Sequence, residues 1–315
     1  MRRRTFLAAA GAASLASCSS PRTVTIPDVV AANAYPPLGD LIEINGRTVH
    51  ATDSGSGGPP VVLLHGSNVN LRDWTFSIAG DLAKKRRVVA MDRPGYGHSE
   101  RGPGTWTPAR QASQLRAAAR VLDIERPILV GHSWGAVVAF AWALENPQEV
   151  SGVVSVSGAN MPWGTAADVL DGLGIMRAGA RYYARRLVRN ADNGGVEDFV
   201  ARAFRPQIPP DGYLDYVGAP LSLRHSTMHA NGQDLAQTHA AISRLSKRYP
   251  ALDLPIEIVH GERDWLLTVD RHVIGFKEQV SQAKISVAPG VGHMAHHARP
   301  DLVETAVARI SAAVS

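Results

Sequence analysis

Residues 127–144 read PILVGHSWGAVVAFAWAL, an apolar run that passes through two glycines and a serine into a helix-compatible segment. Gly131 and Gly135 flank Ser133, so the backbone is free to make a tight turn between a buried strand and a helix. A serine on such a turn exposes its hydroxyl for attack on a substrate. The stretch therefore predicts Ser133 as a nucleophile, and the alternative is that Ser133 only caps the helix N-terminus.

Continuous apolar runs recur along the chain, and segments with helical character separate most of them. The predicted strands are 61–64, 88–91, 128–130, 153–156, 256–259 and 285–288, and the predicted helices are 71–84, 107–123, 135–146, 232–248, 268–280 and 299–313. Before them, residues 41–50 form two alternating runs around Asn45-Gly46, the preferred two-residue hairpin turn. This pattern predicts an α/β protein with a mainly parallel, doubly wound sheet and an antiparallel N-terminal hairpin.

One segment breaks the alternation of strands and helices. No convincing core strand lies between residues 156 and 256, and residues 159–225 hold glycines, prolines, aromatic residues and a basic helical stretch. We interpret 159–225 as a cap inserted into a core formed by 39–158 and 226–315. In open α/β sheets such a cap lies over the strand ends that bind ligands.

The N-terminal residues have the composition of an export signal. Arg2, Arg3 and Arg4 precede an apolar stretch, 6–16, that is too short to span a bilayer, which is typical of a signal peptide over residues 1–17. Without those arginines the net charge of +5 falls to +2, so no nucleic-acid partner is expected. The sequence does not determine the oligomeric state.

Cys18, the single cysteine of the chain, closes the sequence LASC at 15–18. This sequence resembles the lipobox of bacterial lipoproteins, in which the cysteine becomes the acylated first residue, and RRTFL at 3–7 resembles a twin-arginine export signal. The resemblance implies an exported protein held at a membrane through lipid on Cys18, with 18–38 as a tether. The alternative is an ordinary cleaved leader that leaves a free thiol.

From about residue 41 to the end, the chain resembles the α/β-hydrolase superfamily, in which the nucleophilic serine is followed by an acid and then a histidine. The resemblance implies the α/β-hydrolase fold, with Asp264 in HGERD (260–264) as the acid and His293 in GVGHM (290–294) as the base. His293 would take the proton of Ser133, and Asp264 would hold the imidazole tautomer. Both follow predicted strands, so all three groups can meet at one edge of the sheet.

Both partners of the serine have competitors. Glu262 lies two residues from Asp264, but in similar hydrolases the acid occupies the fourth position after the histidine that precedes glycine, which is Asp264. His296 and His297 follow His293 closely, and this spacing raises the alternative of a metal site. No glutamate-bearing helical pair of the zinc-protease kind accompanies them, so we expect these histidines to line the pocket or pack under the loop, and we expect no metal.

The oxyanion of an acyl-transfer reaction needs preorganised hydrogen-bond donors. The resemblance implies the backbone amides of Trp134 and of Ser67, with Asn68 as a candidate third contributor. Residues 92–99, DRPGYGHS, are familiar in this superfamily as a structural turn behind the site, and we assign them no chemistry.

These features predict a membrane-tethered serine hydrolase that acts without a cofactor on the carboxylic ester or related acyl bond of a small molecule. Epoxide hydrolases and haloalkane dehalogenases of this fold place aspartate at the position of Ser133, so an alkyl-enzyme route is not expected. A carbon–carbon bond hydrolase and a cofactor-free perhydrolase remain alternatives, because both use the same triad on this fold. A non-catalytic binding lipoprotein is the alternative from a different class.

Arg177, Arg181, Arg185 and Arg189 would form one ridge of a cap helix. Like charges at this spacing repel weakly. The ridge is either a solvated face or a surface that meets anionic lipid or an acidic substrate.

Overall fold

The computed structural model describes residues 28–164, 166 and 195–314. In this part of the chain, eight strands form one sheet in the order β1-β2-β4-β3-β5-β6-β7-β8. The strands are β1 (Asp40–Glu43), β2 (Thr48–Ser54), β3 (Val61–Leu64), β4 (Val88–Met91), β5 (Ile128–His132), β6 (Gly152–Val156), β7 (Ile256–Gly261) and β8 (Lys284–Ala288). β1 and β2 pair antiparallel and β2 is antiparallel to β4, whereas β3 to β8 run parallel. The predicted α/β-hydrolase fold is confirmed.

The hairpin between β1 and β2 turns at the predicted dipeptide. Ile44 and Arg47 exchange both backbone hydrogen bonds, with N–H to O distances of 2.7 and 3.1 Å, so Asn45 and Gly46 form a two-residue loop. Their φ angles are +51° and +70°. A type I′ turn needs positive φ at both positions, which asparagine and glycine tolerate best.

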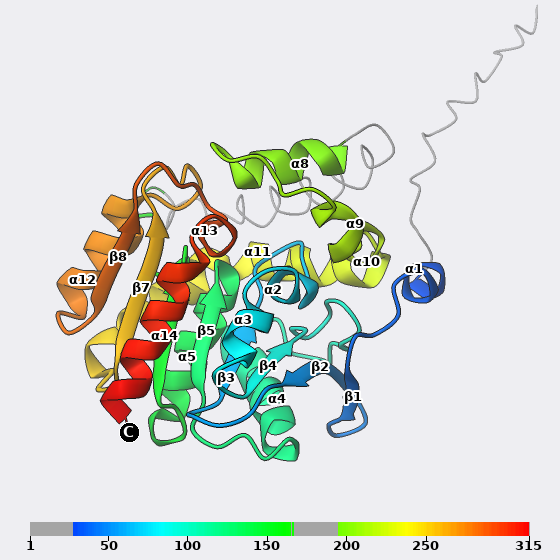
Figure 1. The fold of residues 1–315 in the computed structure, drawn as a ribbon, viewed down its shortest axis with the longest axis horizontal. Coiled ribbons are helices and arrows are strands. Elements are labelled where there is room, and N and C mark those ends of the chain that lie inside the picture. The colour runs from blue at the N-terminus through cyan, green and yellow to red at the C-terminus, as the bar shows by residue number, and fades with distance from the viewer. Residues whose placement is uncertain (1–27, 165, 167–194, 315) are drawn as a thin grey trace, which may run out of the picture.

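Helices cover both faces of the sheet (Figure 1). Successive residues of a strand point to opposite faces, so Val62 and Leu64 of β3 join one hydrophobic cluster, and Val61 and Leu63 join the other. Continuous apolar runs are therefore needed where both faces are buried. The helices are α1 (Asp28–Ala34), α2 (Arg72–Thr75), α3 (Ala79–Ala83), α4 (Pro108–Val121), α5 (Trp134–Glu145), α8 (Gly195–Phe204), α9 (Tyr213–Val217), α10 (Ala219–Ser222), α11 (His225–Ser246), α12 (Gly275–Gln279), α13 (Ala295–Ala298) and α14 (Pro300–Val314).

Some helix bounds differ from the prediction. The single helix expected at 71–84 is two short helices, α2 and α3, and α11 begins seven residues before the predicted 232. The helix expected at 268–280 divides into a π-helical turn, Asp270–Ile274, and α12.

The last part of the predicted tether packs on the domain. Residues 28–34 form α1, and Ala31 is fully buried. Leu38 N–H donates to His50 Nε2 at 3.1 Å, and Arg72 Nη2 donates to the Pro36 carbonyl at 2.6 Å. The sequence of this stretch has no helical period, so its helix was not predicted.

Residues from the predicted cap contact loops at the carboxyl edge of the sheet. Trp265 Nε1, after β7, donates to the Arg202 carbonyl at 2.9 Å, and Gly292 N–H, after β8, donates to Gln207 Oε1 at 3.0 Å. In Figure 1, α8 lies on the side toward which β7 points. The domain boundaries stay a prediction, and the predicted arginine ridge lies outside the described residues.

Among the residues that the structure describes, no helix is both long enough and apolar enough to cross a membrane.

Candidate active site

Ser133 occupies a strained turn between β5 and α5. Its φ of 52° and ψ of −115° lie outside the regions that ordinary residues favour, and its side chain is partly exposed. The flanking glycines make this turn feasible: a Cβ at Gly131 would lie 2.5 Å from the Ala136 nitrogen, and a Cβ at Gly135 would overlap the Leu64 carbonyl oxygen. The turn is fixed by Ser133 N–H, which donates to the Val156 carbonyl of β6 at 3.0 Å.

Asp264 and His293 form a buried hydrogen-bonded pair. His293 Nδ1 lies 2.7 Å from Asp264 Oδ2, and the two residues are 5% and 4% exposed. Asp264 Oδ1 accepts the backbone N–H groups of Leu266 and Leu267, each at 2.9 Å. Burial disfavours the charged carboxylate, but the charge and hydrogen bond of His293 outweigh it, so the pKa of Asp264 is lowered. Asp264 is therefore an anion that can orient and stabilise a protonated His293.

The competing acid, Glu262, lies elsewhere. Its side chain is exposed, and its Oε2 accepts the N–H of Gly290 at 2.8 Å. This contact ties the β7–α12 loop to the turn after β8. Glu262 thus braces the loop that carries His293 without a hydrogen bond to the imidazole.

Parallel strands bring the three candidates to one edge. β5, β7 and β8 end immediately before the segments that carry Ser133, Asp264 and His293. Within the described residues, neither Ser133 Oγ nor His293 Nε2 has a hydrogen-bond partner, so both candidate atoms remain available to a substrate. Such hydrogen bonds are often long before the substrate binds and tighten in the reacting complex.

The two backbone amides expected as oxyanion donors have no hydrogen-bond acceptor among the described residues. The N–H of Trp134 opens α5, and the first N–H groups of a helix have no intrahelical acceptor. The amide of Ser67 follows His65-Gly66 at the end of β3 and has no hydrogen-bond partner within the described residues. Asn68, with φ of +61°, accepts a hydrogen bond from Asn231 Nδ2 at its side-chain oxygen, at 2.6 Å; this contact does not use the N–H groups of Asn68, whose part as a third contributor stays a prediction.

His296 and His297 gather around a buried carboxylate that sequence reasoning missed. Asp73 accepts His296 Nε2 at 3.0 Å, His297 Nε2 at 2.8 Å and the Tyr213 hydroxyl at 2.7 Å. The ligand atoms of Asp73, His296 and His297 lie within 4.8 Å of one another, a spacing that a metal ion would need. As they stand, these groups hydrogen-bond to one another, whereas His296 Nδ1 is buried without a hydrogen-bond partner among the described residues.

This cluster extends to His132, the residue before Ser133. The ring of His132 lies 4.4 Å from that of His296 and 4.9 Å from that of His293, centroid to centroid. Burial is the main cause that lowers the pKa of His296, to about 4. Burial likewise lowers the pKa of His132, and the neighbouring His296 adds to the effect. Both imidazoles are therefore neutral at pH 7, and His293 is not surrounded by further positive charge.

The stretch 92–99 forms the predicted structural turn. Asp92 accepts the N–H groups of Leu71 at 2.7 Å and His98 at 2.8 Å, and His50 Nδ1 lies 2.6 Å away. Arg93, for which no role was expected, donates hydrogen bonds to the carbonyls of His65 and Gly66. Arg93 lies two residues after the buried strand β4, and a charged residue so close to a buried strand end is the signal that could have singled it out, because a buried guanidinium needs acceptors.

Comparisons with known proteins identify the family to which this fold belongs. The family described as alpha/beta hydrolase fold matches residues 59–300. The chain is 27% identical over 266 residues to 2-hydroxymuconate semialdehyde hydrolase of Pseudomonas sp. strain CF600, covering 82% of this chain and 88% of that protein. It is 26% identical over 281 residues to an uncharacterised protein of Mycobacterium tuberculosis, covering 82% and 79%.

A solved esterase of Exiguobacterium antarcticum has the same fold. It superposes with a TM-score of 0.66 at 20% identity, over 86% of this chain and 98% of the esterase. Since the family match covers most of the chain and the site follows the strand ends of the fold, this protein belongs to the alpha/beta hydrolase family and is a hydrolase.

Proposed function

We propose that this hydrolase cleaves a carboxylic ester or a related acyl bond of a small molecule through an acyl-enzyme on Ser133. The observation that carries the proposal is the 2.7 Å contact between His293 Nδ1 and Asp264 Oδ2, at the sheet edge where the strained turn exposes Ser133. The proposed nucleophile, orienting acid and base then lie on three separate segments, which follow β5, β7 and β8.

In the first half-reaction, Ser133 Oγ attacks the carbonyl carbon while His293 Nε2 accepts the hydroxyl proton. The carbonyl π electrons move to oxygen, and the resulting oxyanion takes hydrogen bonds from the amides of Trp134 and Ser67. As the tetrahedral intermediate collapses, the bond to the leaving group breaks and His293 returns the proton to it.

The second half-reaction repeats these steps with water. A water molecule gives its proton to His293 Nε2 and attacks the acyl carbon, and the bond from Ser133 Oγ to that carbon then breaks. The proton returns to Ser133, and a carboxylic acid leaves. Asp264 stays ionised throughout, because its lowered pKa favours the carboxylate in both half-reactions.

A carbon–carbon bond hydrolase is the second candidate. The relative from Pseudomonas sp. strain CF600, which aligns over 82% of the chain, is named a hydrolase of 2-hydroxymuconate semialdehyde. A panel of esters, lactones and that semialdehyde, assayed side by side with the purified protein, separates the two candidates by their kcat/KM.

The mechanism is tested with four variants. Ser133→Ala and His293→Ala should each lower turnover by several orders of magnitude, and a fluorophosphonate should label the parent protein but not Ser133→Ala. Asp264→Asn should lower kcat by about 10⁴-fold, because it favours the wrong imidazole tautomer. Glu262→Gln is the matched control and should be mild. Labelling that survives Ser133→Ala, or greater damage from Glu262→Gln than from Asp264→Asn, contradicts the proposal.

We also propose that the protein is exported and held at a membrane by lipid on Cys18, a residue outside those that the structure describes. The support is the sequence LASC at 15–18. Mass spectrometry of the native protein should find an acylated N-terminus at Cys18, and Cys18→Ser should release the protein from membranes. An unmodified N-terminus at another residue would refute the anchor.

A further inference from the structure

The direction of the Ser67 amide depends on the carbonyl of the preceding residue. A peptide unit is planar and rigid, so the N–H of Ser67 points opposite to the C=O of Gly66 in the same plane. Any group that holds the Gly66 carbonyl therefore also aims the Ser67 N–H. Since that N–H is a proposed oxyanion donor, its direction affects the stability of the tetrahedral intermediate.

One guanidinium holds this loop from behind. Arg93 Nη2 donates to the Gly66 carbonyl at 2.9 Å, and Arg93 Nε donates to the His65 carbonyl, also at 2.9 Å. The Gly66 oxygen has a second donor in His65 Nδ1 at 2.8 Å. His65 therefore carries its proton on Nδ1, because its Nε2 accepts the backbone N–H of Arg93 at 2.9 Å.

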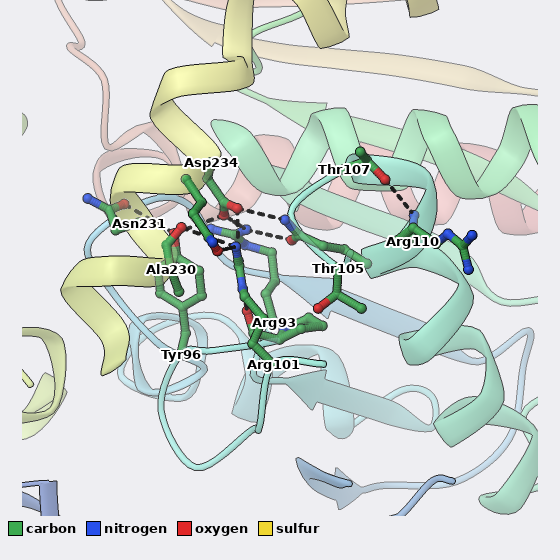
Figure 2. A network of polar contacts seen from close by, with 12 residues as sticks. Arg93, Tyr96, Arg101, Thr105, Thr107, Arg110, Ala230, Asn231 and Asp234 are labelled. Atoms are coloured by element: carbon green, nitrogen blue, oxygen red, sulfur yellow. Dashed lines mark hydrogen bonds and ion pairs between the residues drawn. The ribbon is translucent and has the colours of Figure 1, made fainter. Parts of the chain in front are cut away.

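Arg93 is in turn fixed by a single acid on α11. The side chains of Arg93 and Asp234 are fully buried, and Arg93 Nη1 lies 2.8 Å from Asp234 Oδ2. Gln111 closes the ring: its Oε1 accepts Arg93 Nη1 at 2.8 Å, and its Nε2 donates to Asp234 Oδ1 at 2.9 Å. Figure 2 shows Arg93, Tyr96 and Arg101 converging on Asp234, with the Tyr96 hydroxyl donating at 2.9 Å.

The same helix touches the loop at a second point. Asn231, one turn before Asp234 on α11, donates from Nδ2 to Asn68 Oδ1 at 2.6 Å and accepts the Tyr96 hydroxyl at 3.1 Å. The loop 65–68 is thus held by α11 through Arg93 and through Asn68. Positions 93 and 234 are 141 residues apart, so only the fold brings them together.

We propose that Arg93 and Asp234 are positioning residues that set the direction of the Ser67 N–H in the oxyanion hole. This inference rests on the proposed acyl transfer by Ser133. The planar guanidinium of Arg93 donates two N–H groups to the two carbonyls, and Asp234 holds the guanidinium in place through an ion pair with Nη1. The effect falls on the transition state, because the ground-state carbonyl carries less charge at its oxygen.

The test compares Arg93→Lys, Asp234→Asn and Arg101→Lys in the full-length protein on its best ester substrate. Lysine keeps the charge but lacks the fork, so Arg93→Lys should lower kcat by about 10- to 100-fold while KM changes by less than about threefold. Asp234→Asn should also lower kcat and leave KM nearly unchanged. Affinity for a boronic acid that adds to Ser133 should fall by the same factor as kcat/KM.

Arg101→Lys is the matched control. Arg101 Nη2 pairs with the same carboxylate, at 2.8 Å from Asp234 Oδ1, yet Arg101 makes no hydrogen bond to residues 65–68. It should lower stability while leaving kcat within about threefold. Active-site titration with a fluorophosphonate corrects the activity of each variant for its folded fraction. If Asp234→Asn does not fold, the comparison of Arg93→Lys with Arg101→Lys still tests the positioning role.

The outcomes separate this inference from the proposed function. Hydrolysis that persists in Ser133→Ala overturns the acyl-enzyme itself. Loss of activity in Ser133→Ala, combined with unchanged kcat in Arg93→Lys, overturns only the positioning role. An equal loss of kcat in Arg101→Lys, or a boronic acid affinity that does not follow kcat/KM, also overturns it, because either result indicates general damage to the fold.

Discussion

Acidification should destabilise this protein through buried neutral histidines, and His272 offers the cleanest test. His272 is 1% exposed, and its Nδ1 accepts the backbone N–H of Met161 at 3.2 Å, so a proton at Nδ1 would break that hydrogen bond. Burial, with the neighbouring His260, lowers the pKa of His272 to about 3. The unfolded chain holds its proton up to an ordinary pKa of about 6.5.

The sign and size of the effect follow from these values. A histidine whose folded pKa is lowered contributes full stability above pH 6.5 and loses it as the pH falls, because the unfolded state then binds more protons. At about pH 5 the unfolded imidazole is protonated and the folded one is not, which costs about 2 kcal/mol at about 1.36 kcal/mol per pH unit. Burial also lowers the pKa of His65 and of His296 to about 4, so each adds a similar loss. Together the three account for about 6 kcal/mol, a large share of a typical 5–15 kcal/mol.

His272→Asn tests this value, since an asparagine oxygen can accept the Met161 N–H but does not titrate. Urea unfolding followed by circular dichroism at about pH 7.5 and about pH 5 gives the loss of unfolding free energy for each protein. The loss should be about 2 kcal/mol smaller in His272→Asn than in the parent. His229→Asn, at an exposed position, should leave the loss unchanged. An equal loss in His272→Asn and the parent would refute the reasoning.

Two further substitutions test the packing beneath the site. Gly135→Ala places a methyl group onto the Leu64 carbonyl oxygen and should prevent accumulation of soluble folded protein, which expression and gel filtration beside the parent would measure. Soluble, fully active Gly135→Ala would contradict the close approach of α5 to β3. Asp73→Asn turns an amide donor toward groups that donate to the carboxylate and should cost about 3–5 kcal/mol of unfolding free energy. The exposed Asp81→Asn should cost less than about 0.5 kcal/mol, and a similar small cost for Asp73→Asn would show that the cluster does not need its charge.

The sheet and the turn at Ser133 were predictable because their signals are local. A strand buried on both faces is predominantly apolar, and β3 and β4 are apolar and buried at all four of their positions. The turn at Ser133 needs glycine at two fixed positions, and the hairpin needs positive φ at Asn45 and Gly46. Each requirement is met within a few residues of sequence, so it can be recognised without the rest of the fold.

Helix bounds were less predictable because tertiary contacts override the local pattern. The stretch expected as one helix over 71–84 stops at Thr75, where α2 has placed Asp73 under His296 and Trp74 in the core. A helix continued past Thr75 would carry residues 76–84 in a different direction. The apolar spacing of 71–84 indicates which residues are buried, but it does not indicate which residues they contact.

The buried polar contacts around the site could not be read from the sequence at all. Asp73 and His296 are 223 residues apart, and Arg93 and Asp234 are 141 residues apart. A buried charge without a partner lowers the free energy of unfolding, so each of these residues would destabilise the protein if its partner were absent. Sequence alone marks such residues only as polar groups beside apolar runs, a pattern that solvent-exposed loops also produce. What distinguishes them is that both members of a pair are buried together at the carboxyl edge of the sheet. The residues that contact the loop 65–68 and His132 therefore emerge only when strand order is known, even though the turn at Ser133 is evident from a few residues of sequence.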